Sequence, residues 1–354
     1  MNNSVIPENG KTKDFTLTFI QVISALAVVT LHTNGCFWQF SATERYWFTA
    51  NIIECLCYFA VPVFFMITGI TLLDYQDRYS TKGYFKKRFE KTLLPYVAWS
   101  LIGVLFLLIT KRITPETVTA KWVVSGLLSA DKIIDLYWFF RPLFCVYLCI
   151  PLFASIDKRK KIGTGVYLLI AGFIINTLIP FFSSLFHVGL EWPYRIDVIS
   201  GYLFWIWGGY TVYKAPPTEK QKKAIYVLSL IGLLMHIVGT YTLSVSAGSI
   251  QRSFKGYNNV PCIFYTFGVF VFLKDVAEQI KNIRWLKELI QTLGKYTFPV
   301  YLIHWFVLRV LQDMVGLNTK SITYRLMMPY VIYLVILIIA WLLRKIPVLR
   351  RIVP

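Results

Sequence analysis

Charged side chains are scarce in this chain, and acidic ones most of all. Only 16% of the 354 residues are charged, with 18 Asp and Glu against 37 Lys and Arg. A soluble domain of this size needs a larger polar surface to stay hydrated. Hydrophobic residues make up 56%, and apolar runs of 18 or more residues recur along the sequence. The composition therefore excludes an ordinary soluble domain and predicts a protein that crosses a membrane several times.

The shortage of acidic residues leaves a net charge of +19. In a soluble chain this charge would point to nucleic acid. The basic residues, however, lie in short clusters between the apolar runs, which is typical of cytoplasmic loops. We therefore expect no nucleic-acid partner. Membrane lipids with anionic head groups, or an anionic soluble ligand, would still be attracted to these clusters.

Cysteine is also sparse. The six cysteines fall almost entirely within apolar runs and lack the spacing of a metal site or a disulfide framework. We expect small apolar core residues and no metal. The polar start, MNNSVIPENGKTKD, is followed by an apolar run without a cleavage-site pattern. This predicts a retained span rather than a signal peptide.

The apolar runs predict an all-α, polytopic transmembrane bundle of about ten helices. We expect one membrane-embedded domain over residues 1–354, with a short tail over residues 1–14. Connections on the side of the N-terminus carry about three times as many basic residues as the others, which places both termini in the cytoplasm. Residues 79–92 and 276–292 are expected to form interfacial helices. The expected spans are 15–36, 49–73, 93–110, 135–154, 163–183, 197–213, 224–243, 258–273, 293–312 and 324–343.

The first expected span contains two polar residues, Gln21 and His32. They are eleven positions apart, or about three helical turns, so they share a helix face about 16 Å apart along the axis. A polar stripe of this kind should face a protein interior rather than lipid. The imidazole of His32 suits a general base acting on a hydroxyl. The alternative is a histidine that is held by a neighbouring helix or lies at the outer interface.

Other polar residues gather toward the expected outer ends of the spans. Carboxylates and arginines beside aromatic rings suit a sugar, whose apolar face stacks on a ring while its hydroxyls are hydrogen-bonded. The alternative is an aromatic belt with interfacial charges. His304, in YLIHWF, is either a second site histidine or a packing residue. The other residues of this group are Trp38, Trp47, Glu54, Asp135, Tyr137, Trp138, Arg141, Glu191, Trp192, Arg195 and Asp197.

A compact cationic cluster precedes the third expected span. Arg88 and Lys91 are three positions apart and share a helix face. With Lys82, Lys86 and Lys87 they suit the phosphates of a soluble cofactor or lipid head groups. Ordinary positive-inside residues are the alternative.

Five segments, taken in order, carry a resemblance to a known family. They are AVVTLH ending at His32, VPVFFMITGITLL at 61–73, YFKKRFEKTLLPY at 84–96, YWFFRPLFCVYLCIPLF at 137–153 and LGKYTFPVYLIHWFVL at 293–308. Their order, spacing and ten-span frame resemble the acyltransferase type 3 family of integral membrane proteins over essentially the whole chain.

The resemblance implies a plasma-membrane enzyme that moves an acyl group, often acetyl, from cytoplasmic acyl-CoA to a hydroxyl. The acceptor would be a cell-surface polysaccharide, a sugar or a lipid-linked precursor. Acyl-CoA would be the co-substrate, with no metal. By this resemblance His32 and Gln21 occupy catalytic positions, and Arg88, Lys91 and Lys87 would bind acyl-CoA. The expected acceptor-binding residues are Glu54, Trp138, Arg141 and His304.

Three positions depart from the family pattern. Gln21 stands where the family has an arginine, Thr18 where it has an aspartate, and Lys91 where it has the second arginine of a pair. Glutamine retains hydrogen bonding but cannot pair with a phosphate or carboxylate as arginine does. A transporter or exporter of a glycan or lipid-linked intermediate is therefore an alternative, as is an inactive binding or scaffold protein of the same fold.

Overall fold

The computed structural model describes residues 14–186 and 192–354, except for the side chains of residues 313–315. Within these residues every regular element is helical, which confirms the expected all-α class. The helices are α1 (Phe15–Thr33), α2 (Arg45–Cys57), α3 (Ala60–Leu72), α4 (Thr81–Arg88), α5 (Leu94–Ile109), α6 (Ala120–Ser129), α7 (Phe140–Ala154), α8 (Lys158–Gly172), α9 (Ile179–Leu185), α10 (Tyr202–Lys214), α11 (Glu219–Leu234), α12 (Thr240–Ala247), α13 (Val260–Ile280), α14 (Arg284–Gly294), α15 (Thr297–Val315) and α16 (Ile322–Arg344).

The described residues contain eight helical stretches that are long and apolar enough to cross a membrane. Short π-helical turns join α4 to α5, α8 to α9 and α11 to α12 into continuous stretches. The eight are Phe15–Thr33, Arg45–Leu72, Thr81–Ile109, Asp135–Ala154, Lys158–Leu185, Glu219–Ala247, Val260–Ile280 and Ile322–Arg344. A polytopic membrane bundle is therefore confirmed.

The two remaining expected spans, 197–213 and 293–312, correspond to α10 and α15. The 13 residues of α10 extend about 20 Å, less than the ~30 Å thickness of a bilayer core. The two expected interfacial segments also differ from isolated helices. Residues 79–92 run into α5 without a break, while 276–292 divides between the end of α13 and α14.

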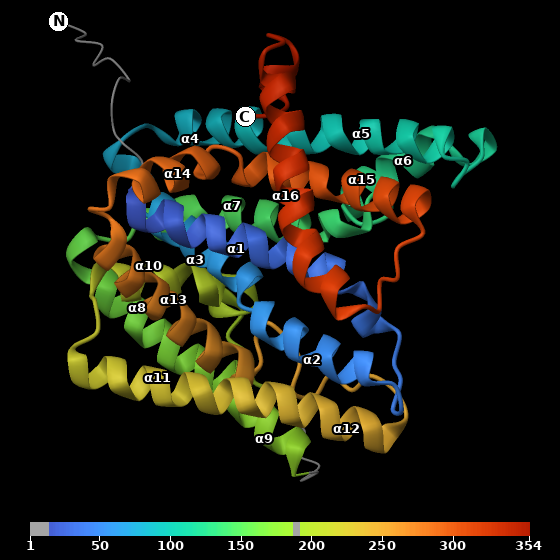
Figure 1. Cartoon of the computed structure of the whole chain (residues 1–354). Coiled ribbons are helices and arrows are strands. Elements are labelled where there is room, and N and C mark those ends of the chain that lie inside the picture. Colours follow the sequence, from blue (N-terminus) through green and yellow to red (C-terminus); the bar gives the residue numbers. More distant parts are fainter. Residues whose placement is uncertain (1–13, 187–191) are drawn as a thin grey trace, which may run out of the picture.

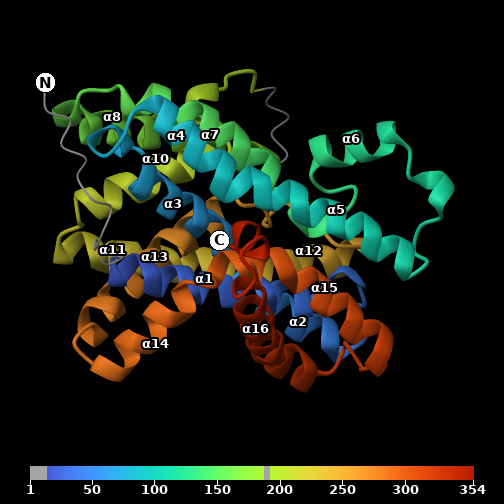
Figure 2. The ribbon, with the colours of Figure 1, turned by 90° about the horizontal axis from the view of Figure 1, so that it is seen from above.

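Helix α1 lies in the middle of the bundle (Figure 1). Its N-terminus is capped by Asp14, whose carboxylate accepts hydrogen bonds from the backbone N–H groups of Thr16 and Leu17. It packs against α3, α13, α14, α15 and α16. Figures 1 and 2 show α16 crossing α1 steeply, while α11 and α12 lie along the opposite side of the bundle from α5. The C-terminal end of α1, which carries His32, is therefore enclosed by protein.

Helices α3 and α10 approach each other more closely than side chains would allow. A Cβ atom at Gly69 would overlap the backbone of Ile206, and one at Gly209 would overlap the backbone of Met66. The two glycines thus let the two backbones touch. This contact also holds the short α10 inside the bundle, where its residues from Phe204 to Thr211 are buried.

A buried ion pair closes the end of α3. Lys161 Nζ lies 3.1 Å from Asp74 Oδ1 and also donates to the carbonyls of Leu73 (3.0 Å) and Ala154 (3.4 Å). The Tyr210 hydroxyl donates to the same carboxylate. Burial alone would raise the pKa of Asp74, but hydrogen bonds from Lys161 and Lys214 outweigh it and lower that pKa below its usual range.

Candidate active site

A cavity of about 850 Å³ lies at the C-terminal end of α1. Its walls come from α1 and the segment after it, from α2, from the start of the fourth span, from the loop before α13 and from α15. Of the residues singled out from the sequence, five line it: His32, Trp38, Glu54, Asp135 and Trp138. The fold therefore brings together polar groups that are more than 100 positions apart.

His32 faces this cavity and stacks on His304, with 5.1 Å between the ring centroids. The Nδ1 atom of His304 lies 2.7 Å from the carbonyl oxygen of Tyr301 and 3.1 Å from that of Val300. Since a carbonyl only accepts hydrogen bonds, neutral His304 holds its proton at Nδ1. His304 is buried behind His32, so it orients the His32 ring from outside the cavity.

Asp135 joins α15 to the cavity wall. Its carboxylate accepts from Trp305 Nε1 at 2.7 Å and from Arg309 Nη2 at 3.3 Å. Trp305 and Arg309 both line the cavity with His32, and the Arg309 guanidinium lies over the Trp305 ring. The sequence reasoning missed these two residues. Arg309 could have been found from the sequence, because it is an ionisable residue within the expected span 293–312, five positions after His304.

A second buried ion pair forms part of the same wall. Lys255 Nζ lies 2.9 Å from Glu54 Oε1, and the two side chains are only 1% and 5% exposed. The Lys255 ammonium also lies 3.7 Å from the centre of the Tyr58 ring. Among the described residues, Glu54 Oε2 has no hydrogen-bond partner. This buried carboxylate thus has one oxygen without a hydrogen bond, in a residue that lines the cavity.

Three aromatic rings stack along the cavity. Tyr257 stacks on Tyr58 at 4.3 Å and on Trp138 at 5.8 Å between centroids, with interplanar angles of 12° and 18°. All three residues line the cavity. Burial raises the pKa of Tyr257 well above its usual value, so its hydroxyl stays protonated. The wall therefore combines flat apolar rings with hydrogen-bonding groups.

Arg325, which the sequence reasoning also missed, fixes the end of α1. It is 1% exposed and donates to Thr49 Oγ1 at 2.8 Å and to the Asn34 side chain at 3.4 Å. Asn34 is the C-cap of α1 and also donates to the backbone of Ala50. One arginine of α16 thereby ties α1 and α2 together directly beside His32.

Other expected site residues lie elsewhere. Trp47 and Tyr137 are buried in the core. Arg141 lines a neighbouring groove rather than the cavity. Gln21 is not among the cavity residues and lies nearer the start of α1. Glu191 is outside the described residues.

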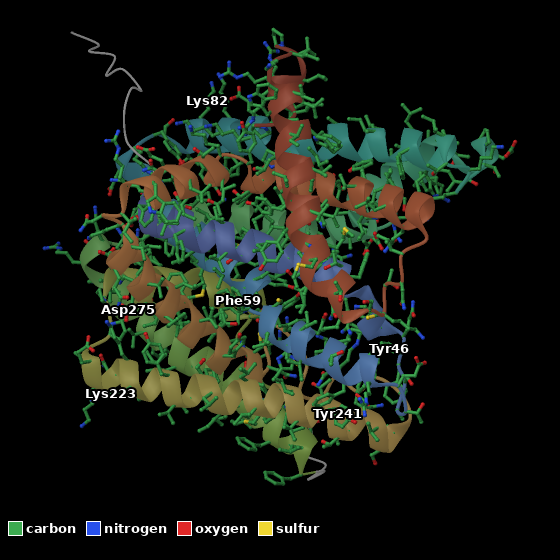
Figure 3. All side chains as sticks on the ribbon, viewed as in Figure 1. Tyr46, Phe59, Lys82, Lys223, Tyr241 and Asp275 are labelled. Carbon is green, nitrogen blue, oxygen red and sulfur yellow. The ribbon has the colours of Figure 1, made fainter. Side chains whose placement is uncertain are left out.

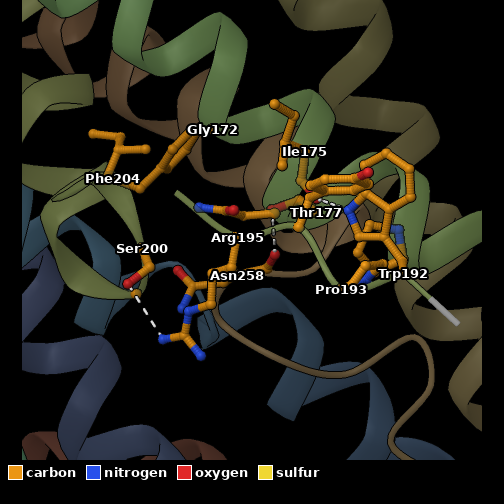
Figure 4. Close-up of a pocket in the computed structure, with 14 residues that line it drawn as sticks. Gly172, Ile175, Thr177, Trp192, Pro193, Arg195, Ser200, Phe204 and Asn258 are labelled. Atoms are coloured by element: carbon orange, nitrogen blue, oxygen red, sulfur yellow. Dashed lines mark hydrogen bonds between the residues drawn. The ribbon is translucent and has the colours of Figure 1, made fainter. Parts of the chain in front are cut away.

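Trp192 and Arg195 line a separate hollow of about 430 Å³ (Figure 4). Its polar side chains are largely bonded to the protein itself. Trp192 Nε1 donates to the carbonyl of Ile175, and the Asn176 amide exchanges two hydrogen bonds with the backbone of Ile196. Arg195 is paired with Asp197 at 2.7 Å. This hollow therefore offers fewer open polar groups than the His32 cavity.

The expected donor-binding residues lie on and just after α4. Lys87 lies 4.3 Å from the centre of the Tyr79 ring, and Arg88 lies over the rings of Tyr84 and Tyr147. Lys91 is exposed in the turn that follows. Figure 3 shows Lys82 of the same cluster, well away from Tyr46 at the start of α2. The cluster is at the end of the bundle where α1 begins (Figures 1 and 2), whereas His32 is near the other end of α1.

The sequence profile of the acyltransferase domain family matches residues 15–345. The chain therefore belongs to the acyltransferase type 3 family, and this membership supports a membrane acyltransferase. Comparisons with curated proteins and with solved structures gave no match.

Proposed function

We propose that this protein is an O-acyltransferase that moves an acyl group, acetyl in the first instance, from cytoplasmic acyl-CoA to a sugar hydroxyl. The sugar would belong to a cell-surface polysaccharide or its precursor. The enzyme would act in the plasma membrane with both termini in the cytoplasm. The observation that carries the proposal is the His32 ring, which faces an 850 Å³ cavity in a chain of this family.

His32 would act as the general base. It removes the proton of the acceptor hydroxyl while the oxygen attacks the thioester carbonyl carbon. The tetrahedral intermediate then expels the CoA sulfur, which takes up the proton from the imidazolium. Arg309 is a cation in the same cavity and would stabilise the negative charge that develops on the carbonyl oxygen. His304 holds the His32 ring in place through their stacking contact.

The donor would bind at the α4 cluster. Arg88, Lys87 and Lys91 would hold the CoA phosphates, since guanidinium and ammonium groups form charge-assisted hydrogen bonds to phosphate. Because this cluster and His32 are near opposite ends of α1, the acyl-bearing arm would run along that helix. Gln21, nearer the start of α1 than His32, would hydrogen-bond the amides of the arm.

The acceptor would bind at the aromatic wall. Trp138, Tyr257 and Tyr58 offer ring faces to the sugar, and Glu54 Oε2 offers an acceptor for one of its hydroxyls. The four residues line the cavity that contains His32. An acceptor hydroxyl in this cavity would therefore lie within reach of the base.

Calorimetry of acetyl-CoA with the full chain in lipid nanodiscs tests the donor site. We expect binding that weakens about tenfold or more with 3′-dephospho-CoA or with Arg88→Gln, because each removes a charge-assisted phosphate contact. His32→Ala should bind acetyl-CoA as the natural chain does. Absence of binding at millimolar acetyl-CoA, in protein with a cooperative unfolding transition, would contradict an acyl-CoA enzyme.

A glycan or lipid-intermediate transporter is the second candidate. Gln21 favours it, since the family arginine is missing from the first span. Release of free CoA from acetyl-CoA in the presence of sugar acceptors separates the two, because a transporter would consume no acyl-CoA.

A further inference from the structure

A groove of about 510 Å³ lies between α7 and α10, next to the His32 cavity. One wall is formed by Pro142, Cys145 and Cys149 of α7, and the other by Tyr202 and Leu203 of α10. Apolar surface predominates along its length. At one end it is bordered by Arg141 and Ser200.

The groove reaches the surface at α7, where its lining residue Cys145 is exposed. Helix α7 belongs to one of the candidate membrane spans, and its Leu148 and Leu152 are 70% and 65% exposed. In a bilayer these side chains contact hydrocarbon. From Arg141 to Cys149 the helix rises about 12 Å, close to the ~15 Å depth of one leaflet. The groove thus has the polarity and length to hold one hydrocarbon chain.

The charged end of the groove suits a phosphate. The Arg141 side chain is 57% exposed, and its ion pair with Asp131, among the described residues, spans 3.7 Å between two half-exposed groups. Such pairs contribute little and exchange readily. A second guanidinium is adjacent, because Arg195 donates to the hydroxyl of Ser200 at 3.3 Å (Figure 4). Its ion pair with Asp197 joins two exposed side chains and should likewise exchange readily. Arginine is well suited to phosphate oxygens.

The groove and the active-site cavity share a residue. Trp138 lines both, and its ring stacks on Tyr257 inside the cavity. A molecule with its chain in the groove and its phosphate at Arg141 would therefore place the next group beside Trp138. That position leads toward His32 and the unpartnered oxygen of Glu54.

We propose that the groove between α7 and α10 binds a lipid-linked sugar, with its hydrocarbon chain along α7, its phosphate at Arg141 and its sugar in the His32 cavity. This assignment rests on the proposed function for the reaction itself, but the binding does not require acyl transfer. It gives Arg141 the role of recognising the lipid phosphate rather than the sugar.

Another lipid-facing groove provides a control. It lies between α8, α11 and α13, has about 470 Å³, and includes Leu169, Leu228 and Phe264. Its lining contains neither a charged residue nor any residue of the His32 cavity. Bulk lipid should occupy it without regard to head group.

Photo-cross-linking of the full chain in nanodiscs tests the proposal. The probe is farnesyl phosphate joined to N-acetylglucosamine, with a diazirine in the chain, and cross-linked peptides are mapped by mass spectrometry. We expect labelling of residues 142–149 and 202–203. An excess of the same phospho-sugar without the diazirine should suppress this labelling, while farnesyl N-acetylglucosaminide, which lacks the phosphate, should not.

Matched variants sharpen the result. Leu203→Trp fills the groove and should reduce the labelling about tenfold, whereas Leu228→Trp fills the control groove and should leave it unchanged. Cys145 is exposed, so Cys145→Trp fills the same groove with little risk to folding. Arg141→Gln should weaken the labelling about tenfold, while Lys132→Gln, which removes an exposed cation outside the groove, should not.

Two outcomes would overturn the proposal. One is equal labelling by a diazirine phosphatidylglycerol that the phospho-sugar does not displace, since the groove would then hold bulk lipid only. The other is labelling that Leu203→Trp and Cys145→Trp both leave unchanged. Failure of the proposed function gives a different result. If the groove is labelled as expected but no CoA is released from acetyl-CoA, the lipid site is supported and the acyltransferase activity is contradicted. If CoA is released with soluble sugars and filling the groove does not change that release, the acyltransferase activity is supported and the lipid site is contradicted.

Discussion

The molecule contains two buried lysine–carboxylate pairs that differ in how completely they are bonded. Glu54–Lys255 and Asp74–Lys161 have nearly equal N–O distances, 2.9 and 3.1 Å. Their carboxylates are 20 positions apart on the stretch formed by α2 and α3, which places them about 30 Å apart if the helices are collinear. Each lysine is almost fully buried.

The environments of the two pairs are unlike. Lys161 donates to two carbonyls as well as to Asp74, and Tyr210 and Lys214 also contact that carboxylate. Both carboxylates have one oxygen without a hydrogen-bond partner among the described residues, Glu54 Oε2 and Asp74 Oδ2. Asp74 Oδ2 lies 3.2 Å from Lys214 Nζ, whereas Glu54 lines the His32 cavity. A pair surrounded by bonds serves the fold. A pair with an unused oxygen at a cavity suits a ligand.

The largest expected effect is the loss of acyl transfer when His32, at the Glu54 end of the bundle, is replaced. His32→Ala removes the general base and should lower acyl transfer by about 10²–10⁴-fold, measured as acetyl incorporation into the acceptor. The thermal unfolding midpoint should stay within a few degrees of the natural chain, since the ring of His32 faces a cavity. A transfer rate equal to that of the natural chain would show that His32 is not the base.

Next in size is the loss of either buried lysine. Lys255→Met and Lys161→Met each remove the buried cation of a carboxylate, and each should cost up to about 3–5 kcal/mol of unfolding free energy, measured by denaturant titration in detergent. The loss should be smaller at Asp74, which keeps its contacts with Lys214 and Tyr210.

The double variants then distinguish the pairs. Replacing both partners with apolar residues often restores stability, so Glu54→Leu/Lys255→Met and Asp74→Leu/Lys161→Met should both be more stable than the single lysine variants. Of the two double variants, only Asp74→Leu/Lys161→Met should also recover acyl transfer. Full transfer by the Glu54→Leu/Lys255→Met variant would show that Glu54 does not bind the acceptor.

A smaller effect is expected at Asp135. Asp135→Asn keeps the shape but removes the charge that holds Arg309 and Trp305. Loss of a charge-assisted bond costs about 1–3 kcal/mol, or roughly tenfold in the transfer rate at limiting acceptor. Glu288→Gln, which alters an exposed ion pair with Arg284 outside the cavity, should leave this rate unchanged.

The smallest effect concerns acid stability. Because the pKa of Asp74 is lowered in the folded protein, its contribution to stability is full above the pKa of an unfolded aspartate, about 3.9. It is lost as the pH falls through the folded-state value. The difference in unfolding midpoint between the natural chain and Asp74→Asn should therefore shrink below about pH 4. A difference that stays constant down to pH 2 would contradict this role of Asp74.

The sequence predicted the helical membrane bundle well, because long apolar runs leave the backbone no other way to satisfy its hydrogen bonds in lipid. It did not predict that the helix within the expected span 197–213 would have only 13 residues. Nor did it predict the backbone contact of α10 with α3 at Gly69 and Gly209, which no local pattern reveals.

The site was predictable where a polar residue interrupts an apolar run. His32, Glu54 and Asp135 were found in this way, and all three line one cavity. Lys255 was not, since it lies in a polar loop and resembles a surface lysine until the fold buries it against Glu54. Arg325 likewise looks like a flanking cation, and its role depends on contacts with α1 and α2.

The backbone contact between α3 and α10 also bears on movement. Two helices that touch at glycines cannot slide or separate without losing dense packing, so they should move as one rigid body. This body includes the α10 wall of the groove. The cavity residue Glu54 lies on α2, and Tyr58 lies in the turn that joins α2 to α3. Helix α7, which contains Pro151 in its interior, is the more deformable wall. Any widening of the groove should therefore displace α7 while α3 and α10 stay in place.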